Sequence, residues 1–155
     1  MKDVMGPLAV HGRWLVRRDL PEAVAIDAAG FGPAAWGEED FLAHLRHRAR
    51  IGSAAEIGGR VVAFCVYELR ERELGILRLA VHPRWRRRGV GGLVVAWLAR
   101  KLSGHRRTSI EALVPERMLE AQLFLRSCGF RWERTEKSSG GDSYSMRLRL
   151  PGKED

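Results

Sequence analysis

The stretch from Leu77 to Leu102, LRLAVHPRWRRRGVGGLVVAWLARKL, constrains the fold of this chain more than any other part of the sequence. An apolar run ends in His82 and Pro83, arginines with one tryptophan follow, and three closely spaced glycines come next. From Val90 onward, apolar residues recur three and four positions apart, which places them on one face of a helix. The stretch therefore predicts a strand, a basic glycine-rich loop and a helix, in that order.

A loop between a strand and a helix is suited to hold an anion. The first N–H groups of a helix have no partner within it, and the helix dipole favours negative charge at that end. Glycines let the backbone approach a ligand closely, and arginines add charge-assisted hydrogen bonds. We interpret the loop as a phosphate site; the alternative is that the glycines only start the helix and the arginines are solvated. The residues concerned are Arg86, Arg87, Arg88, Gly89, Val90, Gly91 and Gly92.

Two other glycine loops that bind nucleotides do not fit this stretch. A P-loop requires Gly-Lys followed by Ser or Thr, and no such sequence follows Gly91 or Gly92. A dinucleotide-binding fingerprint requires a third glycine, and Val94 stands at that position. The loop therefore indicates neither a nucleoside triphosphatase nor a dinucleotide-dependent enzyme.

The rest of the chain alternates between helix-like and strand-like segments. Helical patterns cover 19–30, with Asp19 as the cap and Gly30 as the stop, then 38–50, and a segment from 116 that ends at Gly129. Strand patterns cover 13–18, two runs on either side of Gly58-Gly59, 73–81, 108–114, 130–136 and 144–150. Hairpins mixed with crossovers predict an α/β fold around a mixed, mostly antiparallel sheet of about six to seven strands, with about four helices.

Length and composition limit the class of protein. A chain of 155 residues with 45% hydrophobic residues fits one domain over 1–155, and a net charge of +8 favours anionic partners. Cys65 and Cys128 lie far apart without zinc-ligand spacing, and no set of residues indicates a metal site. No signal-peptide core and no apolar run of about 18 residues occurs. We expect a cytoplasmic protein that does not contact membranes.

The segment AVHPRWRRRGVGGLVVAWL resembles the acetyl-CoA signature, RxxGxG, of the GNAT superfamily of N-acetyltransferases. The segments VRRDLPEAVAIDAAGF, WGEEDFLAHL and MLEAQLFLRSCGF resemble the ribosomal-protein-alanine acetyltransferase branch of that superfamily. The resemblance implies the GNAT fold, in which the strand before the signature splays from its neighbour. It also implies that Leu79, Ala80 and Val81 pair with the pantetheine arm of acetyl-CoA, and that the loop from Arg86 to Gly92 wraps the pyrophosphate.

The reaction implied by the resemblance is acetyl transfer to a primary amine, with the N-terminal amine of a protein as one candidate acceptor. The amine attacks the thioester directly, through a tetrahedral intermediate and without a covalent enzyme intermediate. Such a reaction requires a base for the ammonium, stabilisation of an oxyanion and a proton for the leaving thiolate.

The catalytic residues implied by the resemblance match this chain only in part. Glu111 is the candidate base, with a solvated strand carboxylate as its alternative. Alignment from the Gly129 end places Leu113, on the same strand face, where the branch has its glutamate. Leu125 stands at the position of the branch's tyrosine acid, and Met118 replaces the asparagine that contacts the cofactor. Tyr144 is a candidate substitute acid, with a packing role as its alternative.

Two other functions stay open at this stage. The segments RWRRR and HRRT could bind phosphates of nucleic acid in a ribosome-associated module, but aromatic residues are not interleaved as in a stacking platform. Because of Leu125 and Met118, the chain could also be a degenerate member of the superfamily that binds CoA without turnover.

Overall fold

The computed structural model describes residues 10–102 and 106–150. Seven strands form one sheet in the order β1-β2-β3-β4-β5-β7-β6, and the described residues include four α-helices. The prediction of a mixed, mostly antiparallel α/β sheet is confirmed. In chain order the elements are β1 (His11–Trp14), α1 (Leu20–Phe31), α2 (Glu38–Leu45), β2 (Arg50–Ile57), β3 (Arg60–Leu69), β4 (Glu73–Val81), α3 (Val90–Leu102), β5 (Ser109–Pro115), α4 (Leu119–Ser127), β6 (Arg131–Glu136) and β7 (Ser143–Arg149).

The chain divides into two compact units. The first comprises residues 1–67 and 78–97, and the second comprises residues 68–77 and 98–155. Three elements, β3, β4 and α3, each contribute residues to both units. The expectation of a single domain over 1–155 stays a prediction.

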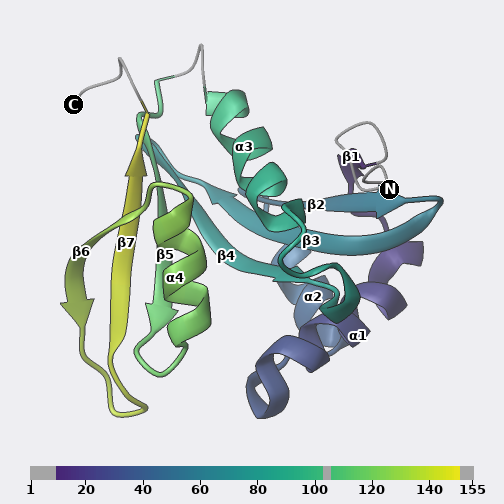
Figure 1. Cartoon of the computed structure of the whole chain (residues 1–155), viewed down its shortest axis with the longest axis horizontal. Helices are drawn as coiled ribbons and strands as arrows, with labels where there is room; N and C mark the ends of the chain where they lie inside the picture. Colours follow the sequence, from purple (N-terminus) through teal and green to yellow (C-terminus); the bar gives the residue numbers. More distant parts are fainter. Residues whose placement is uncertain (1–9, 103–105, 151–155) are drawn as a thin grey trace. The chain divides into compact units, whose positions relative to one another are not determined.

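In the first unit, β1 pairs with β2 in antiparallel register, and the residues of β3 from Val61 to Tyr67 are all buried. Helices α1 and α2 lie on one face of these strands and the first turns of α3 on the other (Figure 1). A Cβ at Gly12 of β1 would lie 2.7 Å from the Trp97 ring of α3. This contact and the burial of Val90 and Val94 confirm the predicted apolar face of the helix.

In the second unit, β4 pairs in parallel with β5 from Glu73–Ser109 to Ile76–Ala112, while β4 itself runs on to Val81. Strand β7 pairs with both β5 and β6 in antiparallel register. Helix α4 lies in front of β5, with β7 beside it (Figure 1). Just after α4, Gly129 has a φ of 103°, which confirms the prediction of a left-handed glycine there.

Strand β1 and the cap of α1 differ from the prediction. Strand β1 ends at Trp14 instead of residue 18, because the Val16 N–H donates to Asp19 Oδ2 at 2.8 Å and the chain turns over Arg17–Asp19. Asp19 precedes α1 as expected but does not cap it, because its carboxylate accepts hydrogen bonds from Arg13 and from the Val16 N–H.

The ends of α1 and α2 are also shifted. Helix α1 continues through Gly30 to Phe31, and Gly32, with a φ of 53°, is the residue that ends it. Helix α2 ends at Leu45 instead of residue 50, because Arg50 already belongs to β2. Among the described residues, no helix is long and apolar enough to span a membrane, and no group of three or more metal-ligating side chains occurs.

Candidate functional site

A short turn links the end of β4 to the basic loop. The His82 N–H donates to the Val62 carbonyl at 2.8 Å, which continues the contact of β4 with β3. His82 Nδ1 then accepts from the Arg84 N–H at 3.1 Å, and Pro83–Trp85 form a turn of 3-10 helix. The turn directs the chain from the partly buried strand into an exposed loop.

The loop that follows has an unusual backbone. Arg87 has a φ of 62°, the only positive φ among the described residues that are not glycine, and Gly89 has a φ of 85°. The Arg86 Nε donates to the Val81 carbonyl at 3.0 Å, so this side chain holds the loop against the strand end. A Cβ at Gly89 or Gly92 would meet no atom within 4 Å. Packing within the protein therefore does not require glycine at position 92.

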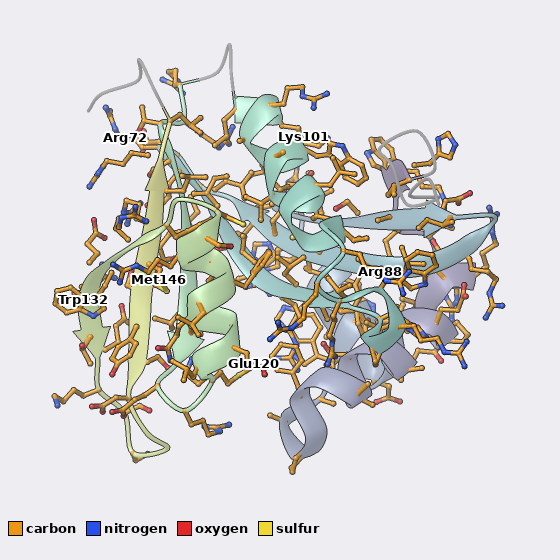
Figure 2. All side chains as sticks on the ribbon, in the orientation of Figure 1. Arg72, Arg88, Lys101, Glu120, Trp132 and Met146 are labelled. Atoms are coloured by element: carbon orange, nitrogen blue, oxygen red, sulfur yellow. The ribbon has the colours of Figure 1, made fainter. Side chains whose placement is uncertain are left out.

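The loop and the first turn of α3 present free donors. Within the described part of the chain, the N–H groups from residue 86 to 92 donate no hydrogen bond, and the Leu93 N–H is the first to do so, to the Gly89 carbonyl. The guanidinium of Arg88 lies 5.4 Å from the centre of the Trp85 ring, beside the start of the helix (Figure 2). In the same described part, the arginines of this segment form no ion pair; they are Arg84, Arg86, Arg87 and Arg88. This set of donors fits a pyrophosphate group.

The second unit contains a cavity of about 400 Å³ around Glu111. Glu111 Oε1 accepts from Arg70 Nη1 at 3.0 Å, and its Oε2 accepts from Ser145 Oγ at 2.8 Å. The carboxylate is 10% exposed, and each oxygen retains a lone pair for a further hydrogen bond. The cavity is lined by Arg70, Glu73, Ile76, Leu77, Glu111, Leu113, Arg134 and Glu136.

Charged side chains around the cavity shift one another's pKa. Burial alone would lower the pKa of Arg70, but its hydrogen bonds to Glu73, Glu111 and Glu68 raise that pKa above its ordinary value. Burial raises the pKa of Glu73, but hydrogen bonds from Arg147 and Arg70 outweigh it and lower the pKa. Arg70 and Glu73 therefore form a linked ion pair in the wall of the cavity, in which each group favours the charged form of the other.

Residues 49–132 match the model of a family described as acetyltransferase (GNAT) domain. The chain belongs to the GNAT acetyltransferase family. The matched residues include the basic loop, α3 and Glu111, and no curated protein matches the sequence.

Solved structures share the GNAT fold at low sequence identity. A ribosomal-protein-alanine N-acetyltransferase from Escherichia coli aligns with a TM-score of 0.78 at 20% identity, covering 94% of this chain and 97% of that one. Ard1 from Thermoplasma volcanium aligns with a TM-score of 0.79 at 22% identity, covering 92% and 98%. An aminoglycoside 6'-N-acetyltransferase complexed with coenzyme A aligns with a TM-score of 0.77 at 11% identity, covering 94% and 99%.

The two positions at which this GNAT chain departs from the expected pattern lie just before α4 and within it. Met118 precedes the helix, and its side chain makes no cap bond. Instead, the Gln122 side chain donates to the carbonyls of Pro115 and Glu116 and so holds the start of α4. Leu125 is buried at 5% exposure, so this position contributes to the core of the second unit.

The candidate base and the candidate acid lie on opposite faces of the sheet. Because side chains alternate along a strand, the register Glu111–Arg147 and Val114–Tyr144 places Glu111 and Tyr144 on different faces. Met146, which Figure 2 labels on β7, is two residues from Tyr144 and lies on the same face. The structure does not bring the two candidates together.

The predicted residues thus fall into two groups. Leu79, Ala80, Val81 and the loop from Arg86 to Gly92 all lie in the first unit, whereas Glu111, Tyr144, Met118 and Leu125 lie in the second. In the segment HRRT, His105 lies outside the described residues, and Arg107 Nε donates to the Arg70 carbonyl at 2.6 Å.

Sequence reasoning missed Arg70 and Ser145, the two partners of Glu111. Arg70 stands at the start of a charged turn, and the sequence contains no signal that it reaches β5. Ser145 is one of two serines in the last strand, and its type alone assigns it no partner. Only the alignment of β5 with β7 reveals its role.

Proposed function

We propose that this protein transfers an acetyl group from acetyl-CoA to a primary amine by direct attack of the amine on the thioester. The observation that carries the proposal is the run of free N–H groups from residue 86 to 92, which contains three arginines and follows a fourth, Arg84, all without ion pairs among the described residues. These groups would hold the pyrophosphate, and the backbone of β4 from Leu79 to Val81, beyond its last pair with β5, would hold the pantetheine arm. When bound, acetyl-CoA supplies an activated acyl group and a good leaving thiolate.

Glu111 is the proposed base. Its carboxylate lines a cavity, is held in place at both oxygens, and has lone pairs left to take a proton from an ammonium or from a bridging water. Leu113 lies two residues further on the same face and is 48% exposed, so it offers an apolar surface beside the carboxylate.

Water is the proposed source of the proton for the thiolate. Tyr144 lies on the face opposite Glu111, and Leu125 at the family's tyrosine position has no proton to give. A thiol with an ordinary pKa of about 8.5 leaves readily enough for solvent to protonate it. The role of Tyr144 as an acid is therefore not needed for turnover.

A cationic amine is the acceptor that the cavity favours. Three glutamates and two arginines line it, together with three aliphatic side chains, so carboxylates outnumber guanidinium groups although the chain as a whole carries +8. An acceptor with an ammonium group and an apolar portion would find matching partners there, and the N-terminal amine of a protein is one such acceptor.

Calorimetric titration with acetyl-CoA tests whether the loop and the end of β4 bind acetyl-CoA. We expect saturable binding that weakens when Arg87 and Arg88 are both replaced by alanine and that does not change in Arg60→Ala, whose side chain is 79% exposed outside the loop. Absence of binding at high micromolar concentrations would contradict the proposal. Loss of RNA affinity in the double variant with unchanged acetyl-CoA binding would favour the nucleic-acid alternative.

Release of the CoA thiol, measured over a panel of primary amines and N-terminal peptides, tests the proposed acetyl transfer and the role of Glu111. We expect Glu111→Gln to lower kcat by about 10²- to 10⁴-fold, as for loss of a general base, while acetyl-CoA still binds. Tyr144→Phe should lower kcat by no more than a few-fold. Binding of acetyl-CoA without turnover on any amine would identify the degenerate alternative.

A further inference from the structure

A notch in β4 holds the guanidinium group of Arg70. A Cβ built on Gly75 would lie 2.3 Å from both Cζ and Nη2 of Arg70 and 2.8 Å from its Nη1. The guanidinium group thus occupies the space that any side chain at position 75 would need. Gly75 has no positive φ, so the strand needs glycine there for space and not for backbone conformation.

In this notch, the guanidinium group of Arg70 donates hydrogen bonds to three carboxylates. Its Nε donates to Glu68 at 3.0 Å, and its Nη1 donates both to Glu73 Oε2 at 2.7 Å and to Glu111 Oε1 at 3.0 Å. The backbone of Arg70 is held as well, because its N–H donates to the Glu73 carbonyl and its carbonyl accepts from Arg107. Arg70 is therefore fixed at both its side chain and its backbone.

Gly75 and Glu111 are direct partners in the parallel ladder between β4 and β5. The notch therefore lies beside the strand position that carries the proposed base. Ser145, which is fully buried, holds the other oxygen of the carboxylate from β7. The carboxylate is clamped between a cation on one side and a hydroxyl group on the other.

We propose that Arg70 is a positioning residue for Glu111 and that Gly75 is present to make room for it. The inference rests on the proposed role of Glu111 as the base. Without the guanidinium group, the carboxylates of Glu68, Glu73 and Glu111 repel one another, and Glu111 loses the bond that fixes its Oε1. A displacement of about 1 Å at a reacting group is enough to lower a rate about 100-fold.

Steady-state kinetics of thiol release test the proposal with three variants. We expect Arg70→Ala and Gly75→Ala to lower kcat by about 10- to 100-fold with the KM for acetyl-CoA unchanged. Arg70→Lys, which keeps the charge but not the forked geometry, should fall between wild type and Arg70→Ala. Gly140→Ala is the matched control, because a Cβ at that position meets no atom within 4 Å.

Chemical rescue separates positioning from folding. Arg70→Ala leaves a hole that fits a guanidinium ion, so millimolar guanidinium, far below unfolding concentrations, should restore part of kcat in this variant and not in Gly75→Ala. In Gly75→Ala the Arg70 side chain is present but displaced, which leaves no vacant site. Failure of rescue in an Arg70→Ala protein with a wild-type circular dichroism spectrum would count against the proposal.

A double-variant cycle decides whether Arg70 acts through Glu111. If it does, Arg70→Ala should cost little kcat when Glu111 is already glutamine, because the two losses are not additive. An equal loss in both backgrounds, or wild-type kinetics in Gly75→Ala, would overturn the inference. Full activity of Glu111→Gln would instead refute the proposed base, which is a separate result.

Discussion

The ion pair between Arg78 of β4 and Asp27 of α1 allows a sharp test of how the first unit is held together. Arg78 Nε and Nη2 donate to the two carboxylate oxygens at 2.9 and 2.8 Å, and Nη2 also donates to the Ala34 carbonyl at 2.7 Å. The Trp36 N–H donates to Asp27 at 2.7 Å, and the Arg78 guanidinium lies 3.6 Å from the centre of the Phe31 ring. One pair therefore links a strand, a helix and the loop that follows the helix.

Replacing Arg78 with methionine should be more damaging than replacing Asp27 with asparagine. The Asp27 side chain is fully buried, so Arg78→Met leaves a carboxylate whose remaining partner among the described residues is the Trp36 N–H. Removing one partner of a buried pair costs about 3–5 kcal/mol, which corresponds to a fall in Tm of about 6–20 °C for a chain of this size. In Asp27→Asn, Arg78 keeps the Ala34 carbonyl, the aromatic ring and some contact with water. We expect a loss of about 1.5–3 kcal/mol there.

Urea denaturation followed by circular dichroism measures these losses. The surface pair of Arg60 and Glu22, with side chains 79% and 32% exposed, is the control, and its loss in Arg60→Ala should cost less than about 1 kcal/mol. The double variant Asp27→Asn with Arg78→Met should lose less stability than the two single variants lose together, because neither charge is left without its partner. A loss in Arg78→Met no larger than that in Arg60→Ala would refute the reasoning.

Two further predictions concern the same unit. In Gly12→Ala the new methyl group would lie 2.7 Å from the Trp97 ring, so we expect a loss of about 1–3 kcal/mol in urea denaturation, and the loss should shrink when Trp97 is leucine. The hydrogen bond from Arg13 outweighs burial and lowers the pKa of Asp19 below its ordinary 3.8, so the carboxylate stabilises the folded state above that pH. The stability difference between wild type and Asp19→Asn should therefore disappear as the pH falls through the lowered pKa, and a difference that stays constant down to pH 2 would contradict this.

The loop and its flanking elements could be predicted because the forces that form them are local. The apolar strand, the arginine-rich turn and the helix face from Val90 depend on neighbours within a few positions along the chain. Their boundaries in the structure agree with the prediction, with β4 over Glu73–Val81 and α3 starting at Val90. The predictions for the end of β1 and the cap of α1 were wrong because Asp19 accepts hydrogen bonds from Arg13 of β1 and not from the first turn of α1.

The partners of Glu111 and Asp27 could not be predicted, because the contacts join residues far apart in the chain. Arg70 and Glu111 are 41 positions apart, and Arg78 and Asp27 are 51 apart. No propensity or short motif specifies such pairs, since they depend on which strands become neighbours. Gly75 is the exception in principle, because a glycine inside a strand indicates that another group approaches closely, although it does not say which.

The alternation of side chains along a strand predicts which residues of one strand share a face, but it does not predict the relation between Glu111 and Tyr144, which lie on different strands. Within β5, this alternation alone places Glu111 and Leu113 on one face, and both residues line the cavity. Between β5 and β7, the alternation does not predict which residues share a face until the register of the two strands is known. A slip of one residue would move every side chain of β7 to the other face. The observed register pairs Ser145 with Leu113 and so brings the Ser145 hydroxyl group to the Glu111 carboxylate. The same register that gives Glu111 its second partner is the one that turns Tyr144 away from it.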